Sequence, residues 1–443
     1  MVLTKLLACI ALMATAACNQ SLFEHGSTAG DDTSPGDGGA DSSVPATCQA
    51  PCVADAAADF DGTATGSTHR WRYLDDTRQR AWTPMVAGTP MAGTEANAIT
   101  TCAAKGSAAA CAHLPGALLV TSSGASSTAD PAIEITAPAN KVLQLAIRVH
   151  VPAGGKPQEV RLYRAAREDR LFTGTAMPGT TLDAAITVDA FAGDRFLLAL
   201  APTAMGTADV GVQMFVSETG EAFPRNCQLG LTFEPPTAIG SSLRNECNTT
   251  PVTSWNDQPA TEVMVPPAFA AGPFPESGMA GDFIEGKRLD TQVVADRTGD
   301  HTAQFWFKLD QYVASSAAVV LSDMDLDDGD PGGVAMDVFE FGGVNSFEAL
   351  TCTSGTPTEY TQGKSDYPAV NEWHFIRVVQ RGDTMTGCID GVKKFEAAVP
   401  AGSAVSSYPL RIGRNSVWQP QASYLDGQVD DLRFFKGVAL PCE

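Results

Sequence analysis

Residues 371–399, NEWHFIRVVQRGDTMTGCIDGVKKFEAAV, predict three short strands joined by two tight turns. Apolar and polar side chains alternate on both sides of the first turn, as expected for strands with one buried face. Asp390-Gly391 is typical of a type I′ turn, because both central residues of that turn need a positive φ. Arg381-Gly382-Asp383 spells an integrin-recognition tripeptide, but its position favours a plain hairpin turn. We expect a meander that organises one antiparallel sheet.

Length and composition indicate an all-β protein with two domains. A chain of 443 residues is too long for one small core. Its 41 glycines and 28 prolines, with few amphipathic helical runs, favour short strands and many turns. The formal net charge of −22 disfavours nucleic acids and anionic membrane surfaces as partners, because both attract basic surfaces. The same charge leaves room for bound divalent cations.

The N-terminal end indicates export. The short apolar run 6–13 follows a basic residue and is typical of a secretory signal, being too short to span a bilayer. The segment before Cys18 resembles a bacterial lipobox, which implies a signal peptide over 1–17 and a lipid anchor on Cys18. Thr15 stands where that motif usually has Leu, so ordinary signal cleavage is the alternative. Asn19 implies sorting to the outer membrane by the same resemblance.

Residues 18–47 are predicted to form a disordered tether. Their small, polar and acidic side chains bury too little apolar surface to offset the entropy of ordering. As a flexible coil this segment would reach about 30 Å, which suits display of a folded domain above a membrane.

The cysteines predict disulfides, because an exported chain meets an oxidising compartment. Of 11 cysteines, one leaves with the signal and one takes lipid, so one of the remainder stays free or pairs between chains. Zinc is disfavoured, because the chain has no CxxC pair and its six histidines are dispersed. The expected pairs are Cys48–Cys52, Cys102–Cys111, Cys352–Cys388 and Cys227–Cys442, with Cys247 as the competing partner.

Residues 48–222 show strand-length alternating segments separated by turn residues, which predicts a jelly-roll β-sandwich. The turn APANK before a long strand, and a later AGDR turn, resemble carbohydrate-binding-like sandwich modules. Aromatic residues here could stack on a sugar, but packing in the core is the favoured interpretation. A group of arginines is expected to lie on a solvated strand face. These residues are Trp71, Tyr73 and Trp82, and Arg161, Arg164, Arg167 and Arg170.

Several segments of the second half follow one known order: QLGLTFE (228–234), TAQFWFKL (302–309), WH (373–374), CIDG (388–391), LRIG (410–413) and LDGQVDDLRFF (425–435). Together they resemble the concanavalin A-like, laminin G-like family. The resemblance implies a second jelly roll over 223–443. The family has Leu where this chain has Asp282 or Met279. Regular alternation in the last segment would put Val429 and Arg433 on one face, and Asp430 and Leu432 on the other.

The resemblance also covers glycoside hydrolases, whose carboxylates lie on one strand as E-x-D-x-E or E-x-D-x-x-E. The nearest segment is AMDVFE (335–340), where Ala335 occupies the place of the expected nucleophile. Asp337 and Glu340 would fall on opposite faces of a regular strand. The sequence therefore favours a protein that is not an enzyme, with hydrolysis as the alternative.

The acidic loop 323–330 is the best candidate site. Its alternating carboxylates followed by Gly329 resemble a calcium loop, because calcium prefers hard oxygen ligands at a sharp turn. Clustered carboxylates repel one another without a counter-ion, although a solvated acidic turn is the alternative. The candidate ligands of a possible calcium ion are Asp323, Asp325, Asp327, Asp328 and Asp330.

Together these features predict a secreted lipoprotein, anchored to the bacterial outer membrane or cell surface, with two β-sandwiches. The expected function is non-catalytic binding or adhesion, with a glycan or an extracellular protein as partner, through loops at the sandwich rim. A concanavalin A-like hydrolase and a structural envelope protein are the alternatives. The sequence does not identify the ligand.

Overall fold

The computed structural model describes residues 48, 50–62, 71–77, 82–105, 109–114, 116–233, 243, 245–248, 252–255, 268–274, 277–283, 287–311, 317–323, 333–341, 344–352, 360–367, 369–399, 406–413 and 425–442. All of them belong to one compact unit, 42–443. The predicted signal peptide, lipidation site and tether lie outside these residues. Among the described residues, no helix is both long and apolar enough to cross a membrane.

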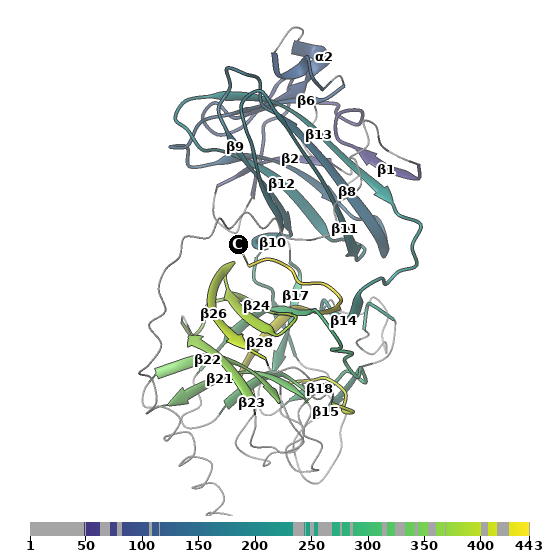
Figure 1. Cartoon of the computed structure of the whole chain (residues 1–443), viewed down its shortest axis with the longest axis vertical. Coiled ribbons are helices and arrows are strands. Elements are labelled where there is room, and N and C mark those ends of the chain that lie inside the picture. Colours follow the sequence, from purple (N-terminus) through teal and green to yellow (C-terminus); the bar gives the residue numbers. More distant parts are fainter. Residues whose placement is uncertain are drawn as a thin grey trace, which may run out of the picture. The chain divides into compact units, whose positions relative to one another are not determined.

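The described residues of the first sandwich form two antiparallel sheets (Figure 1). One has the order β11 (Thr181–Ala190), β8 (Lys141–His150), β13 (Ala208–Glu218), β6 (Leu118–Ser122), β5 (Ala98–Thr101) and β4 (Met91–Ala92), with β1 (Cys52–Asp55) beside β13. The other has the order β10 (Ala166–Ala176), β9 (Gln158–Arg164), β12 (Arg195–Pro202), β7 (Asp130–Thr136), β2 (Trp71–Asp76) and β3 (Trp82–Pro84). Two short helices follow β5, namely α2 (Cys102–Lys105) and η1 (Ala109–Cys111).

The second sandwich also pairs two antiparallel sheets. The first, here the meander sheet, has the order β16 (Ala268–Ala271), β17 (Met279–Phe283), β28 (Gly427–Lys436), β19 (His301–Leu309), β24 (His374–Arg381), β25 (Thr384–Ile389) and β26 (Val392–Ala398), with β14 (Cys227–Leu231) beside β28. The opposite sheet has the order β15 (Thr253–Trp255), β18 (Arg288–Asp290), β27 (Arg411–Ile412), β20 (Ala317–Ser322), β21 (Val334–Phe341), β22 (Val344–Cys352) and β23 (Tyr360–Asp366).

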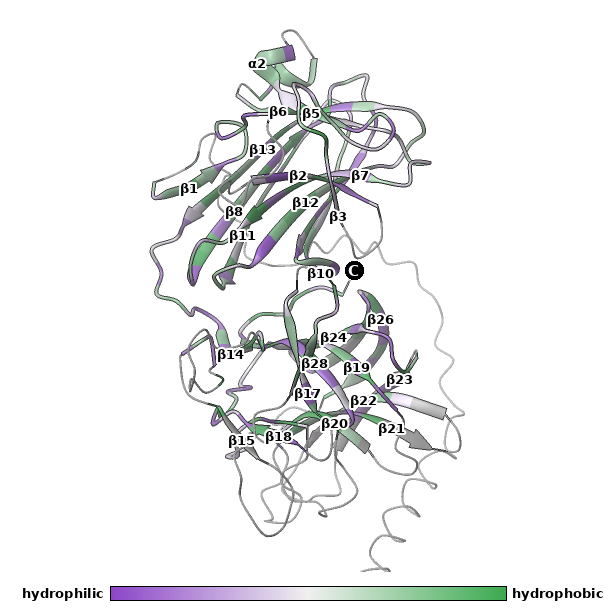
Figure 2. Cartoon of the chain, turned by 180° about the vertical axis from the view of Figure 1, so that it is seen from behind, coloured by the Kyte–Doolittle hydropathy of each residue, from purple (hydrophilic) through white to green (hydrophobic). Residues whose placement is uncertain are grey.

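Each sandwich closes over its own apolar core. Alternate residues of β8 and β13 meet those of β9 and β12 in the first, and Figure 2 shows β8 and β13 largely in the green of hydrophobic residues. In the second, Phe305 and Phe307 of β19 meet Val338 and Phe347 of the opposite sheet. The predicted all-β class with two sandwiches is therefore confirmed.

The meander predicted over residues 371–399 is β24, β25 and β26. Asp390 and Gly391 have φ of 54° and 76°, the positive values that a type I′ turn requires. The Asp390 carboxylate also accepts the backbone N–H of Phe375 at 2.8 Å and lies 2.7 Å from His374 Nδ1. Gly382 forms the tip of the other turn, with φ of 54°. Both predicted turns are confirmed.

The predicted alternation along β28 is wrong. Val429, Leu432 and Phe434 all lie in the core. Asp431 has φ of 44°, and the pairing of β19 with β28 shifts register at this point. Such a bulge inserts one residue and reverses the alternation that follows. The side chain of Asp430 therefore lies on the face of the sheet away from this core, and its carboxylate accepts the N–H of Asp431 at 2.7 Å.

The structure changes two of the predicted disulfides. Cys48–Cys52 and Cys102–Cys111 form as expected. Cys227 bonds to Cys247, which was the competing partner, and Cys388 bonds to Cys442. The pairings Cys352–Cys388 and Cys227–Cys442 are therefore wrong. The C-terminal segment returns to β25, a long-range contact that sequence separation could not indicate.

An ion network joins β24 of the second sandwich to β10 of the first. Arg377 is 1% exposed and pairs with the carboxylate of Asp169. Its guanidinium also donates to Gln304 Oε1 at 3.0 Å and to the carbonyl oxygen of Pro441 at 2.5 Å. Gln304 in turn donates to Asp169 at 3.0 Å. We call Asp169, Gln304 and Arg377 the junction network.

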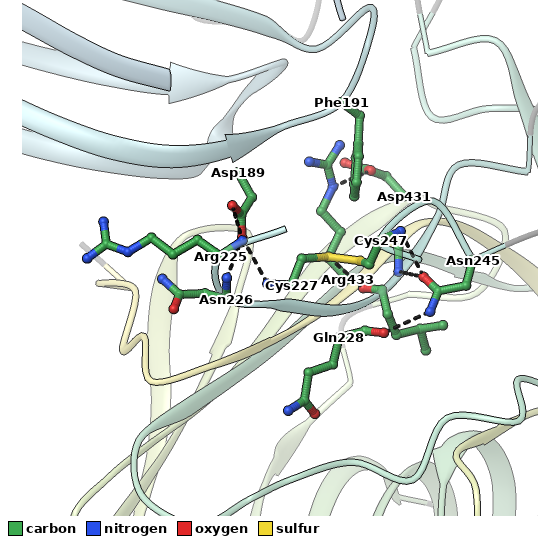
Figure 3. The surroundings of a disulfide bond; sticks show 12 residues. Asp189, Phe191, Arg225, Asn226, Cys227, Gln228, Asn245, Cys247, Asp431 and Arg433 are labelled. Carbon is green, nitrogen blue, oxygen red and sulfur yellow. Dashed lines mark hydrogen bonds and ion pairs between the residues drawn. A yellow bond between two sulfur atoms is a disulfide. The ribbon is translucent and has the colours of Figure 1, made fainter. Parts of the chain in front are cut away.

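A second set of contacts fixes residues 225–227, in the segment that connects the two sandwiches (Figure 3). The carboxylate of Asp189 accepts three consecutive backbone N–H groups, those of residues 225–227, at 2.7–2.9 Å. Arg433 lies 4.5 Å from the ring centroid of Phe191 and donates to both carboxylate oxygens of Asp194, at 2.9 and 2.7 Å. A bidentate pair fixes direction as well as distance.

Candidate functional site

The acidic loop is only partly within the described residues. Asp323 is buried, its Oδ1 accepts the N–H of Val334 at 2.6 Å, and its Oδ2 lies 3.4 Å from Arg297. Arg297 is itself 8% exposed, so this carboxylate has a buried counter-charge and closes the base of the loop. The other four predicted ligands lie outside the described residues. Calcium at this loop stays a prediction.

The aromatic residues of the first sandwich do not offer a sugar platform. Trp71, Tyr73 and Trp82 are 4%, 2% and 5% exposed. Trp71 donates its indole N–H to Asp59 at 2.9 Å, and the Tyr73 hydroxyl donates to the carbonyl of Ala56 at 3.1 Å. Their packing role, which the sequence favoured, is confirmed.

The arginine group of the first sandwich is more buried than predicted. Arg164 is 3% exposed and lies 3.7 Å from Asp169 of the junction network. Arg167 lies 3.2 Å from Asp76, and Arg161 pairs with Glu159. The prediction of a solvated face is therefore wrong for Arg164, because this end of β9 meets the second sandwich.

Two carboxylates face each other on the outer side of the opposite sheet. Asp337 of β21 pairs directly with Glu348 of β22 in the strand register, and both are buried. Burial raises the pKa of Asp337 well above its ordinary value, and the neighbouring Glu348 raises it further. Burial also raises the pKa of Glu348, whereas a hydrogen bond from Gln362 and the charge of Lys364 lower it. The carboxylate beside Asp337 is thus that of Glu348, on the neighbouring strand, which the sequence did not indicate. The side chain of Glu340 lies outside the described residues.

This pair makes stability depend on pH. The folded chain binds a proton at Asp337 more tightly than the unfolded chain does, so stability falls as the pH rises from about 4 towards the raised pKa. We expect Asp337→Asn to raise the free energy of unfolding at pH 7 by about 1 kcal/mol or more, and to change it little at pH 4. Urea unfolding at both pH values checks this. Asp366→Asn, at an exposed position of β23, is the control; equal effects of the two variants would contradict the argument.

The outer face of the meander sheet also carries a set of polar side chains near the C-terminal end of β19. Along β19, outward residues pass from Gln304 in the junction network, through buried Trp306, to half-buried Lys308. The strand register places Lys308 beside Gln428 of β28, and Gln428 beside Asp282 of β17. A row of three polar side chains therefore crosses three strands of this sheet.

An aromatic ring borders this row. Lys308 Nζ lies 5.9 Å from the ring centroid of Trp373, within the range of a cation–π contact. Trp373 packs on one side against a buried cluster that contains Trp306 and Phe375, and it is partly exposed on the other. The ring is thereby held in place while part of it meets solvent.

Carboxylates complete the group. Lys308 lies 3.4 Å from Asp310, and the backbone N–H of Asp310 donates to the carbonyl of Asp426 at 3.0 Å. Burial and then the charge of Asp310 raise the pKa of Asp282, while Lys287 and Lys308 lower it. Among the described residues, Asp282 Oδ1 has no hydrogen-bond partner although it is buried. We call these residues the rim patch: Asp282, Lys308, Asp310, Trp373, Asp426 and Gln428.

The rim patch combines a supported aromatic face with hydrogen-bond donors and acceptors at fixed positions. An apolar platform with a few convergent polar groups is the usual composition of a small-ligand site. The sequence showed one signal, because Asp282 is charged where the resembled family has Leu. It did not show the row, because the register between β17, β28 and β19 joins segments far apart in the chain.

The described residues of the second sandwich form the two antiparallel sheets of a jelly roll. Residues 286–443 match the family model of the concanavalin A-like lectin/glucanases superfamily, so the C-terminal part of the chain carries a domain of this superfamily. The match includes every residue of the rim patch except Asp282.

Solved structures with similar folds have low sequence identity. Domain 4 of AbnA, an extracellular GH43 arabinanase of Geobacillus stearothermophilus solved with arabinotriose, is 16% identical with a TM-score of 0.36, over 49% of this chain and 94% of that one. A structure of botulinum neurotoxin type C, whose cell entry depends on interaction with two ganglioside molecules, is 12% identical with a TM-score of 0.34, over 48% of each chain. The aligned part thus spans about half of that toxin chain. A search of curated proteins finds no match.

Proposed function

We propose that this chain is an exported, lipid-anchored, non-catalytic protein that binds a glycan at the rim patch. The observation that carries the proposal is Trp373, a partly exposed ring held from behind and flanked by Lys308 and Asp310. A sugar ring presents an apolar face to such an aromatic and its hydroxyl groups to the polar neighbours. The match of residues 286–443 to the concanavalin A-like lectin/glucanases superfamily model supports this function.

The charge of the rim patch favours a neutral saccharide. It holds three carboxylates and one ammonium group, Asp282, Asp310, Asp426 and Lys308, in a chain of net charge −22. Carboxylates accept hydrogen bonds from sugar hydroxyls but repel the acidic groups of sialylated or uronic glycans.

The test is a glycan array with the intact chain, followed by titration of the best ligand. We expect binding to neutral oligosaccharides, and a loss of affinity of about 30-fold, about 2 kcal/mol, in Trp373→Ala, because a central aromatic anchor is removed. Lys394→Gln, at an exposed position of β26, is the control. Equal affinity of Trp373→Ala and the native chain would exclude this site.

The same array run with and without calcium tests the loop 323–330. We propose that a calcium ion binds at this loop, because its clustered carboxylates need a counter-ion. Isothermal titration should then give heat on calcium addition. No heat and no thermal shift would leave the loop as a solvated acidic turn.

Hydrolysis is the second candidate, because Asp337 and Glu348 place two carboxyl groups with raised pKa values on adjacent strands. Such a pair can supply a proton donor and a carboxylate. Release of reducing sugar from a glucan panel, lost in Asp337→Asn, would favour this activity. No release from any glucan would exclude it.

A further inference from the structure

A pair of histidines lies on the outer face of the first sandwich, away from the rim patch. His150 ends β8, where the strand register places it between Thr181 of β11 and Gly211 of β13. The segment closed by the Cys102–Cys111 disulfide lies over this part of the sheet. A Cβ atom at Gly211 would come 2.5 Å from the carbonyl oxygen of Ala110, so glycine allows this close approach. His113 lies two residues beyond Cys111.

The buried member of the pair has one nitrogen in use. His150 is 3% exposed, and its Nδ1 lies 2.9 Å from Thr181 Oγ1. Within the described part of the chain, its Nε2 has no hydrogen-bond partner although it is buried. If Nδ1–H donates to the threonine hydroxyl, Nε2 carries a free lone pair. Histidine ligands of metal ions typically have this arrangement, with the far nitrogen fixed by a hydrogen bond.

The second histidine supplies an accessible imidazole beside it. The ring of His113 is exposed, and its centroid lies 4.3 Å from that of His150, with 34° between the planes. Arg148, two residues earlier on the same face, is paired with Asp183 at 3.0 Å.

We propose that His113 and His150 form a binding site for a divalent first-row transition-metal ion, with Cu²⁺ preferred. Imidazole nitrogens suit Cu²⁺, Ni²⁺ and Zn²⁺, and Cu²⁺ binds such ligands most tightly of the three. No group of three or more His, Cys, Asp or Glu side chains suited to a metal occurs in the described residues. Water or a partner would complete the coordination, so the ion would be exchangeable. The Thr181 hydroxyl acts as a positioning group for His150.

Titration of the intact chain with Cu²⁺ tests this site. Calorimetry measures the affinity, and electron paramagnetic resonance detects nitrogen coordinated to the ion. We expect His113→Ala to weaken one Cu²⁺ site at least tenfold and to remove its nitrogen signal. Because His113 is exposed, this variant should fold, and circular dichroism checks that it does. Lys105→Ala, an exposed change in the same disulfide-closed segment, should keep native affinity.

Thr181→Val should weaken copper binding less than His113→Ala does, because it removes only the hydrogen bond that orients His150. Unchanged copper affinity and an unchanged nitrogen signal in His113→Ala would overturn the proposal. Glycan binding is measured on a different sandwich, so its presence or absence has no bearing on this result.

Discussion

Replacing Arg377 with Met is expected to lower the free energy of unfolding by about 3 kcal/mol. The guanidinium is 1% exposed, and it neutralises Asp169 of the other sandwich. Removing it leaves a buried carboxylate without its main counter-charge and leaves the carbonyl of Pro441 without a donor. Arg164, which stays 3.7 Å from Asp169, limits the loss to the lower end of the usual range.

Denaturant unfolding followed by tryptophan fluorescence measures this effect. Arg381→Met, the same substitution at the exposed end of the same strand, should change the midpoint little. The double variant Arg377→Met/Asp169→Leu should recover part of the loss, because an apolar pair can replace a buried ion pair at small cost. If Arg377→Met is as stable as Arg381→Met, the junction network contributes nothing to folding.

Removal of the Cys388–Cys442 disulfide should be the second large effect. The bond closes a sequence separation of 54 residues, and chain entropy then predicts a loss of about 4 kcal/mol on replacing both cysteines with alanine. It also ties down Leu440, which packs against the core of the first sandwich and against the small cluster around Phe435. The thermal midpoint of the double-alanine variant measures the loss.

The matched control is removal of Cys102–Cys111, with a separation of 9 residues, for which the same entropy predicts about 3 kcal/mol. That bond closes a segment on one sandwich only. We expect the thermal midpoint to fall further for the C-terminal pair. The reverse order would show that the C-terminal segment adds no packing between the sandwiches.

The sequence predicts the features of this fold that depend on neighbouring residues. Asp390-Gly391 specifies its own turn, because the positive φ values at 390 and 391 are a local requirement. The close cysteine pairs follow from short loops in the same way. Alternating segments of strand length predict the two sandwiches, because each sheet buries one face.

Features set by register or by distant segments cannot be predicted from neighbouring residues. One bulge at Asp431 reversed the faces of the rest of β28, and alternation alone does not reveal an inserted residue. Glu348 is opposite Asp337 only because β21 and β22 pair in one particular register. The partner of Cys388 depends on where the C-terminal segment returns. The rim patch likewise needs three strands to be aligned.

The outer face of β19 has a mechanical consequence. Gln304 in the junction network and Lys308 in the rim patch lie on one strand, only about 13 Å apart at the usual rise per residue. A ligand pulled away by fluid flow would therefore transmit tension along β19 directly into the contacts with Asp169. The pull would load the contacts that Gln304 and Arg377 make with Asp169 of the first sandwich.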